Sequence, residues 1–458
     1  MDKENASLLE TVQELLTARS FVKLRELVAD LNPVDVGVLM EELSEEELLL
    51  FFRLLPKELA AEAFVNVDGD VQEQLVRGFT DRELADVMNE LYVDDAVDMI
   101  EEMPANVVKR ILQYTDPEMR KSINEILKYP SDSAGSLMTT EYVDLKAHMT
   151  VEQAFEHIRK TGVDKETIYT CYVIDENRHL IGLVTVKDLL LASYDSLLCD
   201  IMETNVIYAD THEDRELVAE KFQKYGFMAL PVVDKEQRLV GIITFDDAMD
   251  VIEEETTEDI EMMAAITPTH KSYMRTGVLE TWGKRIPWLL LLMISATFTG
   301  MIISGFEDKL KASVVLTAFI PMLMDTGGNS GSQASVSIIR ALSLGELELR
   351  DIGRVLWKEG RVAILCGLAL GTVNFGKMLL VDGLLMHNPA VTVMVALVVS
   401  LTLFITVLFA KLVGGSLPIL AKAVGFDPAV MASPFITTIV DALSLMVYFE
   451  IATLLLHL

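Results

Sequence analysis

The stretch PFITTIVDALSLMVYFEIATLLL, residues 434–456, decides the architecture of the C-terminal part of the chain. It is long and apolar enough to cross a bilayer as a helix, yet Asp441 lies in its first half and Glu450 lies further along. A charge at mid-membrane costs at least about 2.5–3.5 kcal/mol, so such residues usually face a bundle interior or a water-filled path. Asp441 therefore predicts a cation site inside a membrane domain. The alternative is a protonated Asp441 that is hydrogen-bonded to a neighbouring helix.

Four other apolar segments precede this one, and together they predict five transmembrane spans. The spans cover residues 286–306, 312–339, 362–381, 383–410 and 428–458. Basic residues concentrate in the loops on the side of the N-terminus, which obeys the positive-inside rule. These residues are Lys284, Arg285, Arg340, Arg350, Arg354, Lys358, Arg361, Lys411 and Lys422. We expect a multi-pass plasma-membrane protein whose N-terminus is cytoplasmic. Within the spans, Lys377 is the candidate basic partner for an acid.

The second span contains the unusual stretch PMLMDTGGNSGSQASVSIIR, residues 321–340. Its proline and glycines either interrupt the helix or allow a neighbouring helix to approach closely. Packing alone does not explain Asp325, Asn329 and Gln333 in the same stretch. Polar side chains and freed carbonyl groups beside a pore would suit hydrated cations.

The charge of the chain is divided unevenly along its length. The 458 residues carry a net charge of −32 although 51% are hydrophobic. From residue 286 onward, 10 Lys/Arg stand against 11 Asp/Glu, so −31 of the charge belongs to the first 285 residues. The N-terminus lacks the pattern of a signal peptide, so we expect this acidic part in the cytosol. Its charge argues against nucleic acid as a partner and points to cations. The few histidines and the scattered cysteines show no catalytic or zinc-binding pattern, which argues against an enzyme.

Residues 1–130 repeat a pattern of about 12 residues, as in TDRELADVMNEL and YVDDAVDMIEEM. Each piece opens with a helix-start residue and continues with apolar residues at helical spacing. Helices this short are unstable alone, so the pattern predicts an acidic superhelix that shares one core. The carboxylates form a solvated face or bind divalent cations, with Asp94 and Asp95 as the candidates, because paired carboxylates repel unless a cation neutralises them.

Residues 131–253 contain a tandem duplication at an offset of 59 residues. YVIDENRHLIGLVTVKDLLLA aligns with PVVDKEQRLVGIITFDDAMDV, so that Thr185 and Asp188 match Thr244 and Asp247. The pattern resembles a pair of CBS domains, α/β modules that commonly bind adenine nucleotides. The resemblance implies that the two Thr/Asp pairs contact ribose and phosphate. A purely structural pair of modules is the alternative.

A linking segment, residues 254–285, joins the repeat to the membrane domain. The acids around its start predict either a solvated face or a regulatory cation site. They are Asp246, Asp247, Asp250, Glu254, Glu255, Glu258 and Asp259. A helix that lies against the membrane domain would form the mechanical link.

Taken together, the chain resembles the MgtE family of magnesium channels, most specifically in GGNSGSQ (327–333) and GFDPAVMASPFITTIVD (425–441). The resemblance covers the acidic helical superhelix, the CBS pair, the linking helix and the five-span α-helical transmembrane domain (286–458). It implies a homodimer whose pore follows the two-fold axis, with Asp441 at the Mg²⁺ site and Asp427 nearer the cytosol. Ser433 stands where some members have Asn, and Asp325 where an apolar residue or Gly is common. Polar pore-lining residues would be Asn329, Gln333, Ser433 and Thr437.

The predicted function is import of hydrated Mg²⁺ down its electrochemical gradient. Mg²⁺ sheds water reluctantly, so two carboxylates across a dimer axis would hold the hydrated ion. The acidic cytosolic surfaces would repel one another until Mg²⁺ bridges them and the linking helix closes the pore. ATP in the CBS pair could bias the same equilibrium. A cation-coupled divalent-ion exchanger and a membrane sensor without transport activity are the alternatives.

Overall fold

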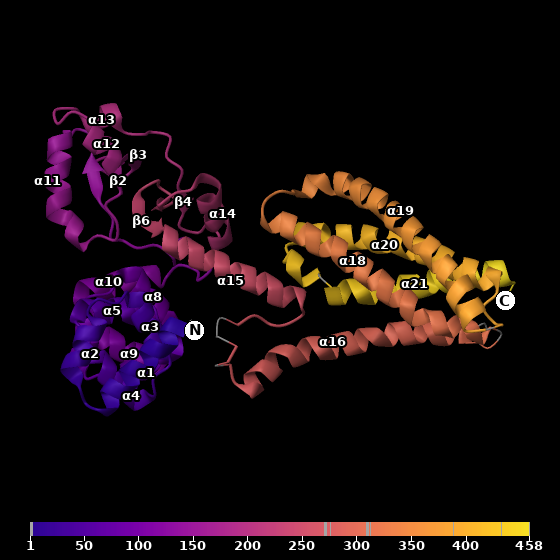
Figure 1. The fold of residues 1–458 in the computed structure, drawn as a ribbon. Coiled ribbons are helices and arrows are strands. Elements are labelled where there is room, and N and C mark those ends of the chain that lie inside the picture. Colours follow the sequence, from indigo (N-terminus) through magenta and orange to yellow (C-terminus); the bar gives the residue numbers. More distant parts are fainter. Residues whose placement is uncertain are drawn as a thin grey trace. The chain divides into compact units, whose positions relative to one another are not determined.

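The computed structural model describes residues 3–269, 273–274, 276–307, 311, 313–387, 389–431 and 433–457. The chain divides into two compact units, residues 1–252 and 253–458. Each unit is described by itself (Figure 1).

The first unit begins with ten short helices. They are α1 (Lys3–Thr17), α2 (Phe21–Val28), α3 (Pro33–Glu41), α4 (Glu45–Phe52), α5 (Lys57–Val65), α6 (Gly69–Gly78), α7 (Asp81–Met88), α8 (Val93–Glu102), α9 (Ala105–Tyr114) and α10 (Pro117–Ile126). Several open on the caps that the sequence suggests. The Asn32 side chain accepts a hydrogen bond from the Val34 amide, and Thr80 and Glu83 form a reciprocal capping box.

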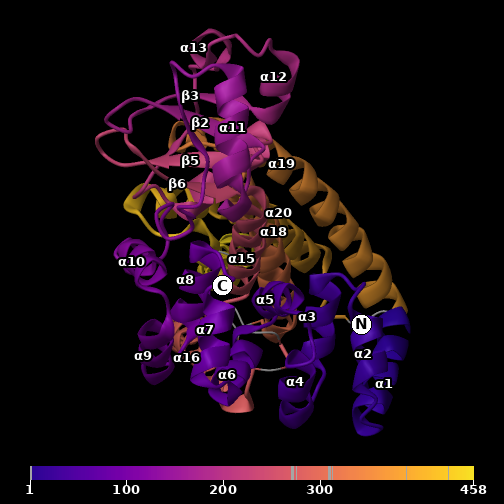
Figure 2. The same ribbon diagram turned by 90° about the vertical axis from the view of Figure 1, so that its left-hand side faces the viewer.

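From α3 onward, each helix packs on the helix two places further along the chain. Thus α3 contacts α5, α5 contacts α7 and α7 contacts α9, while α4, α6, α8 and α10 form the alternating row. Figure 2 shows these helices lying one beside the next. This arrangement confirms the predicted superhelix, in which helices too short to be stable alone share one core.

Two small sheets follow, and they repeat each other in register. The strands are β1 (Asp144–Lys146), β2 (Thr170–Ile174) and β3 (Leu180–Thr185), then β4 (Ala209–Asp210), β5 (Ala229–Val233) and β6 (Leu239–Thr244). In each sheet the first two strands are parallel and the last two antiparallel. Thr170 opposes Thr185 and Ala229 opposes Thr244, so the pairing preserves the offset seen in the sequence. The duplication predicted from the sequence is therefore also present in the pairing of the strands.

Helices cover the two sheets and connect them. They are α11 (Val151–Thr161), the short turn η1 (Gly162–Asp164), α12 (Val186–Leu191), α13 (Leu198–Ile201) and α14 (Arg215–Tyr225). One hydrophobic core runs from the superhelix into the second repeat, where it includes Phe222, Leu230 and Ile243. The first repeat has a separate core around Leu145, Val173 and Val184.

Helix α15 (Phe245–Met263) begins at the end of the second repeat and continues into the second unit. The other elements of that unit are α16 (Val278–Gly305), η2 (Val314–Phe319), α18 (Ile320–Ser343), η3 (Leu349–Asp351), α19 (Ile352–Lys377), the π-helix η4 (Met378–Leu385), α20 (Val393–Val424), η5 (Pro428–Met431) and α21 (Ser433–Leu456). Helix α18 packs on α20 and α21, α19 packs on α20, and α16 packs on α21.

Among the described residues, four helical segments are long and apolar enough to cross a membrane: Val278–Gly305, Leu349–Leu385, Val393–Val424 and Pro428–Leu456. The polar helix α18 is not among them, so the predicted count of five spans is not confirmed. The predicted start of the fourth span at residue 383 is wrong, because Gly383 belongs to η4 and α20 starts at Val393.

The placement of Lys411 in a loop is also wrong. Lys411 lies inside α20 and is only 5% exposed, since its face of the helix packs within the bundle. The long aliphatic stem of a lysine can be buried among apolar side chains. A hydropathy average takes no account of this, so the charge of Lys411 predicts the end of a span.

The glycine-rich stretch of α18 is a continuous helix, with its proline in the first turn. Close approach, and not interruption, is therefore the reason for the glycines. A Cβ atom added at Gly414 of α20 would lie 2.2 Å from the carbonyl oxygen of Gly331. The expected freed carbonyl groups are not found in this stretch, because its backbone is helical throughout.

Candidate cation sites

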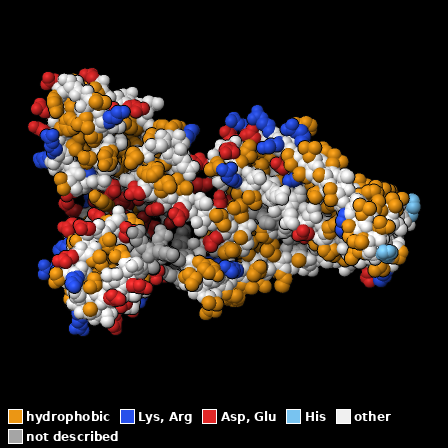
Figure 3. Space-filling model, in the orientation of Figure 1, with side chains coloured by type: hydrophobic (Ala, Val, Ile, Leu, Met, Phe, Trp, Pro, Cys, Tyr) orange, Lys and Arg blue, Asp and Glu red, His pale blue; other side chains and the backbone are white. Residues whose placement is uncertain are grey.

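An acidic interface lies between the superhelix and the CBS pair in the first unit. We define it by Asp94, Asp95, Glu141, Glu166, Asp246 and Asp247, whose charges influence one another. Figure 3 shows acidic side chains gathered between the helical and the α/β parts of this unit. Asp94 and Asp95 occupy the first turn of α8, and Asp246 and Asp247 occupy the first turn of α15. The fold thus joins two acid pairs that the sequence places far apart.

Asp94 is the most deeply buried member of the acidic interface, with 5% of its surface exposed. Its Oδ1 atom and the Oε2 atom of Glu166 are buried and have no hydrogen-bond partner among the described residues. None of Asp94, Asp95, Glu166 and Asp247 forms an ion pair with Lys or Arg in the part of the chain that the structure describes. These oxygens therefore lack the partners that buried carboxylates normally require.

Burial and mutual repulsion raise the pKa values across this interface. Burial, followed by the charge of Asp247, raises the pKa of Asp94 well above its ordinary value and that of Asp95 to about 7. Burial, followed by the charge of Asp95, raises the pKa of Glu166 to about 8. Burial also raises the pKa of Asp247 to about 6, although the hydrogen bond from Thr244 opposes this shift. The ionised cluster is thus strained by its own charge.

No sequence pattern points to Glu141 or Glu166 as part of a cation site, because neither belongs to an acid pair or a helical repeat. Glu141 is fixed by two hydrogen bonds. The Val93 amide donates one (3.1 Å) and the Thr139 hydroxyl donates the other (3.0 Å) to its Oε2 atom. Even with these additions, no three His, Cys, Asp or Glu side chains in the described ranges are close enough together to hold a bare metal ion.

The two Thr/Asp pairs of the CBS repeats cap helices. The hydroxyl of Thr185 donates to Asp188 (2.5 Å), and that of Thr244 donates to Asp247 (2.5 Å). The equivalent acids nevertheless differ, because Asp188 is exposed while Asp247 belongs to the acidic interface. Capping accounts for the motif structurally, and nucleotide contact by these residues stays a prediction.

The C-terminal part of α15 contacts other helices of the second unit. Ser343, at the end of α18, donates a hydrogen bond to Asp259 (3.0 Å). Burial raises the pKa of Asp259, and the nearby charge of Asp427 adds to the shift. Met262 and Met263 pack against a small core of Ile339 and Ala429. The other predicted acids, Asp250, Glu254, Glu255 and Glu258, follow along the same helix.

In the membrane helices, Asp441 of α21 lies close enough to Asp325 of α18 for their charges to interact. On α18, an exposed polar stripe is formed by Asp325, Asn329, Gln333 and Ser337, which recur every four residues. The opposite face of α18 is buried. A polar face on an otherwise apolar bundle requires water or polar partners, because lipid cannot satisfy its hydrogen bonds.

Other predicted pore residues lie near this stripe. The methyl group of Thr437 would be 2.8 Å from a Cβ atom at Gly328, so α21 passes close to α18 there. Asp427 accepts a hydrogen bond from the Ala429 amide (2.7 Å) and is exposed. The side chain of Ser433 lies outside the described residues. Lys377, which the sequence offers as a candidate partner for an intramembrane acid, pairs with Asp382 (2.9 Å).

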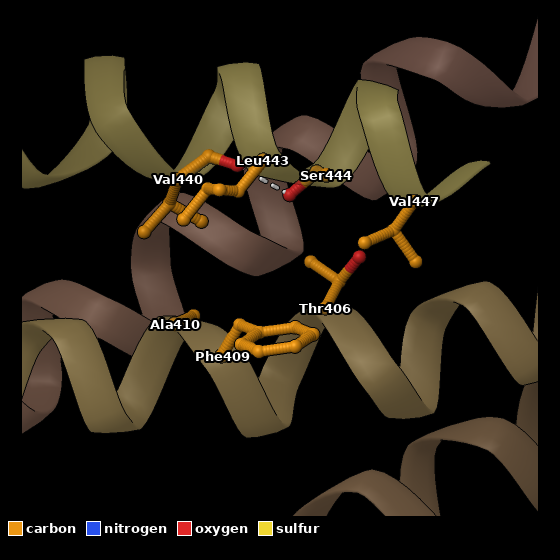
Figure 4. Close-up of a pocket in the computed structure, with 7 residues that line it drawn as sticks. All are labelled: Thr406, Phe409, Ala410, Val440, Leu443, Ser444 and Val447. Atoms are coloured by element: carbon orange, nitrogen blue, oxygen red, sulfur yellow. Dashed lines mark hydrogen bonds between the residues drawn. The ribbon is translucent and has the colours of Figure 1, made fainter. Parts of the chain in front are cut away.

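A narrow crevice opens between α20 and α21, next to Asp441 in sequence (Figure 4). It is lined by Thr406, Phe409, Ala410, Val440, Leu443, Ser444 and Val447. The crevice is too narrow to admit a water molecule. Because its lining is mainly apolar, this crevice is unsuited to a hydrated cation.

Sequence families account for most of the chain. Residues 320–451 match the MgtE family, described as a divalent cation transporter, and residues 31–132 match the MgtE intracellular N domain. Residues 134–195 and 198–254 match the CBS domain.

Curated relatives extend over nearly the whole chain. The magnesium transporter MgtE of Thermus thermophilus is 37% identical, and the match covers 98% of this chain and 98% of the relative. The magnesium transporter MgtE of Bacillus subtilis is 32% identical, with 94% of each chain covered.

Two solved structures resemble the first half of the chain. One is the cytosolic domain of the Mg²⁺ channel MgtE in complex with ATP, with a TM-score of 0.51 and 36% identity. It covers 53% of this chain and 99% of that structure. The other is the soluble part of a magnesium transporter, with a TM-score of 0.51 and 30% identity, covering 55% and 99%.

Proposed function

The chain belongs to the MgtE family of divalent cation transporters, and from this premise we propose that it is a Mg²⁺ channel closed by cytosolic Mg²⁺. It resides in the plasma membrane as a multi-pass homodimer, with the superhelix and the CBS pair in the cytosol. The observation that carries the gating proposal is the acidic interface, where buried carboxylate oxygens lack partners.

Mg²⁺ suits this interface chemically. The ion prefers oxygen ligands and retains several waters, so it can neutralise carboxylates that are not positioned to coordinate it directly. Hydrated Mg²⁺ would supply water donors to the orphan oxygens of Asp94 and Glu166. It would also relieve the repulsion that raises the pKa values of Asp95 and Asp247. Binding therefore favours the state in which α8 and the start of α15 are held together.

Closure is transmitted along α15. Its first turn belongs to the acidic interface, and its last turn contacts α18 and η5 through Asp259, Met262 and Met263. When Mg²⁺ is scarce, repulsion separates the acids at the first turn, and α15 leaves the contact near Ser343. In this proposal the single continuous helix α15 couples ion binding in the first unit to the pore.

The pore forms where two copies of the polar stripe face each other. Asp441 and its neighbour Asp325 from each subunit would hold a hydrated Mg²⁺ through its waters, which avoids the cost of dehydration. Asn329, Gln333 and Thr437 provide further polar surface. A membrane potential favours the entering ion by about 4.6 kcal/mol per 100 mV, twice the value for one charge.

ATP is the proposed ligand of the CBS pair, because a relative's cytosolic domain has been solved in complex with ATP. The half-buried Thr185 and the exposed Asp188 are available to it. Asp247, the equivalent of Asp188, is shared with the acidic interface, so nucleotide and Mg²⁺ would affect the same equilibrium.

Mg²⁺ flux into liposomes tests this proposal. Full-length protein is reconstituted, a potassium diffusion potential is applied, and an internal dye reports Mg²⁺. We expect flux without any Na⁺ or H⁺ gradient, loss of flux in Asp441→Asn, and normal flux in Glu450→Gln, which removes an exposed acid from the same helix. Flux that requires a counter-ion gradient would identify an exchanger instead, and undiminished flux in Asp441→Asn would exclude the proposed pore.

A further inference from the structure

The outward face of α19 changes from basic to apolar along its length. The inner face is buried against α20 through Val355, Glu359, Ala363 and Gly367. The opposite face exposes Arg354, Trp357, Lys358 and Arg361, which we call the basic ridge, followed directly by Ile364, Leu365 and Leu368. Figure 3 shows Lys and Arg side chains gathered over the beginning of α19.

Within the part of the chain that the structure describes, two cations of the basic ridge lack an acidic partner. Lys358 and Arg361 form no ion pair among the described residues, whereas Arg354 pairs with Asp351 (2.9 Å). Glu359 does not compensate them, because it is 9% exposed and faces the bundle interior. The Arg361 guanidinium instead lies over the ring of Trp357, 5.5 Å from its centroid, and its Nε atom donates to the Trp357 carbonyl (3.3 Å).

The dimensions place the basic ridge at the level of lipid headgroups. From Arg354 to Arg361 the helix rises about 10 Å, somewhat more than one headgroup layer, which is about 5–8 Å deep in a bilayer about 40–45 Å thick around a core of about 30 Å. Residues 362–376 carry no charge, and Lys377 marks their far end. Arg361 and Lys377 are thus about 24 Å apart along the axis, close to the thickness of the core when both side chains snorkel outward.

We infer that the basic ridge is a docking site for an anionic phospholipid headgroup of the cytosolic leaflet. The phosphate lies between Lys358 and Arg361, Trp357 lies at the carbonyl level of the lipid, and the acyl chains lie along Leu365 and Leu368. Charge complementarity selects an anionic lipid, and the continuous apolar surface selects a lipid over a soluble anion. The inference rests on the proposed orientation with a cytosolic N-terminus, but it concerns lipid binding and not Mg²⁺ conduction.

Native mass spectrometry of the full-length protein tests the docking site. The protein is titrated with dioleoylphosphatidylglycerol or dioleoylphosphatidylcholine, and retained lipids are counted. We expect wild type to retain phosphatidylglycerol in preference to phosphatidylcholine. In the variant Arg354→Gln/Lys358→Gln/Arg361→Gln, the ratio of retained phosphatidylglycerol to phosphatidylcholine should fall by about tenfold or more. The control variant Lys23→Gln/Lys109→Gln/Lys121→Gln removes the same charge from exposed positions of the superhelix and should retain the preference.

Three results would overturn the inference: equal retention of both lipids by wild type, undiminished preference in the ridge variant, or a changed oligomeric state of that variant in place of lipid loss.

A second measurement avoids substitutions in the ridge. With Trp282→Phe/Trp288→Phe, Trp357 becomes the single tryptophan, and brominated lipids should quench its fluorescence; no quenching would exclude a headgroup-level position. Mg²⁺ flux of the ridge variant, measured in phosphatidylcholine liposomes, should equal that of wild type, which separates this inference from the proposed channel.

Discussion

Ser343 at the end of α18 donates a 3.0 Å hydrogen bond to Asp259 near the end of α15. The contact joins the helix that leaves the CBS pair to the helix that carries the polar stripe. It stabilises the docked position of α15, and the pKa of Asp259 is raised there because burial and the charge of Asp427 disfavour its ionised form.

Ser343→Ala should weaken this docking. Loss of one hydrogen bond costs about 1 kcal/mol, which corresponds to a shift of roughly fivefold between closed and open states. We expect that cytosolic Mg²⁺ must be roughly fivefold higher to close the channel. Liposome flux at a series of internal Mg²⁺ concentrations measures this shift. Ser193→Ala, at an exposed position of the first repeat, serves as the control, and an unchanged closing concentration for Ser343→Ala would contradict the role of the contact.

Asp94→Asn should stabilise the first unit in the absence of Mg²⁺. The change removes a buried charge that has repelling neighbours and no ion-pair partner among the described residues. We expect the melting temperature in EDTA to rise by about 2–4 °C and the stabilisation by Mg²⁺ to shrink. Differential scanning fluorimetry measures both. Asp30→Asn, which changes an exposed acid far from this interface, should alter neither; a lower melting temperature for Asp94→Asn in EDTA would show that its charge is favourable.

The acidic interface should make stability depend on pH. The folded-state pKa values of Asp95 (about 7), Glu166 (about 8) and Asp247 (about 6) lie above their ordinary values, with burial as the largest cause. The folded state therefore binds more protons, so the stability is fully present at low pH and is lost as pH rises between about 4 and about 8.

Hydrogen exchange of the α8 amides, measured in EDTA, tests this sign. Protection should fall as pH rises through this window, after correction for intrinsic exchange. Millimolar Mg²⁺ should remove most of the dependence, because the ion replaces the protons. Protection that rises with pH in EDTA would contradict the repulsion described for these acids.

Gly414→Ala should destabilise the membrane unit. The added Cβ atom would lie 2.2 Å from the Gly331 carbonyl oxygen, so α18 and α20 must separate. Overpacking of this kind costs about 1–3 kcal/mol. The melting temperature of the detergent-solubilised protein measures the effect. Gly360→Ala on α19 has its nearest neighbour at 3.8 Å and should be tolerated. Equal stability of the two variants would show that the helices can adjust without cost.

The sequence predicted the fold of the first unit well, because its signals are local. Caps such as Asn32 and the box of Thr80 and Glu83 mark each short helix, and the duplicated motif fixes the strand register. Only part of the acidic interface could be predicted. Acid pairs at 94–95 and 246–247 are visible in the sequence, but Glu166 joins them only through the packing of the superhelix on the CBS pair.

The membrane helices were predicted less well, because hydropathy records charge and not environment. Lys411 and Glu359 are both buried in the bundle, although the sequence pattern predicts Lys411 in a loop and gives no sign that Glu359 faces the interior. Helix α18 has a polar face because it carries Asp325, Asn329 and Gln333. That it forms one unbroken helix cannot be deduced from a sequence with so many glycines. Such features depend on which neighbour each face meets.

The hydrophobic core that joins the superhelix to Phe222, Leu230 and Ile243 has a consequence for unfolding. The two repeats have similar sequences, but their hydrophobic cores are connected differently to the rest of the unit. We expect the second repeat to unfold together with the superhelix, because neither can lose its packing without exposing the core that they share. The first repeat has its own core around Val173 and meets the second repeat through a smaller cluster that includes Tyr172, Ala229 and Leu239, so we expect it to open at a lower free energy than the rest of the unit. The order in which parts of the first unit unfold would then follow the packing of their cores and not the sequence boundary between the two repeats.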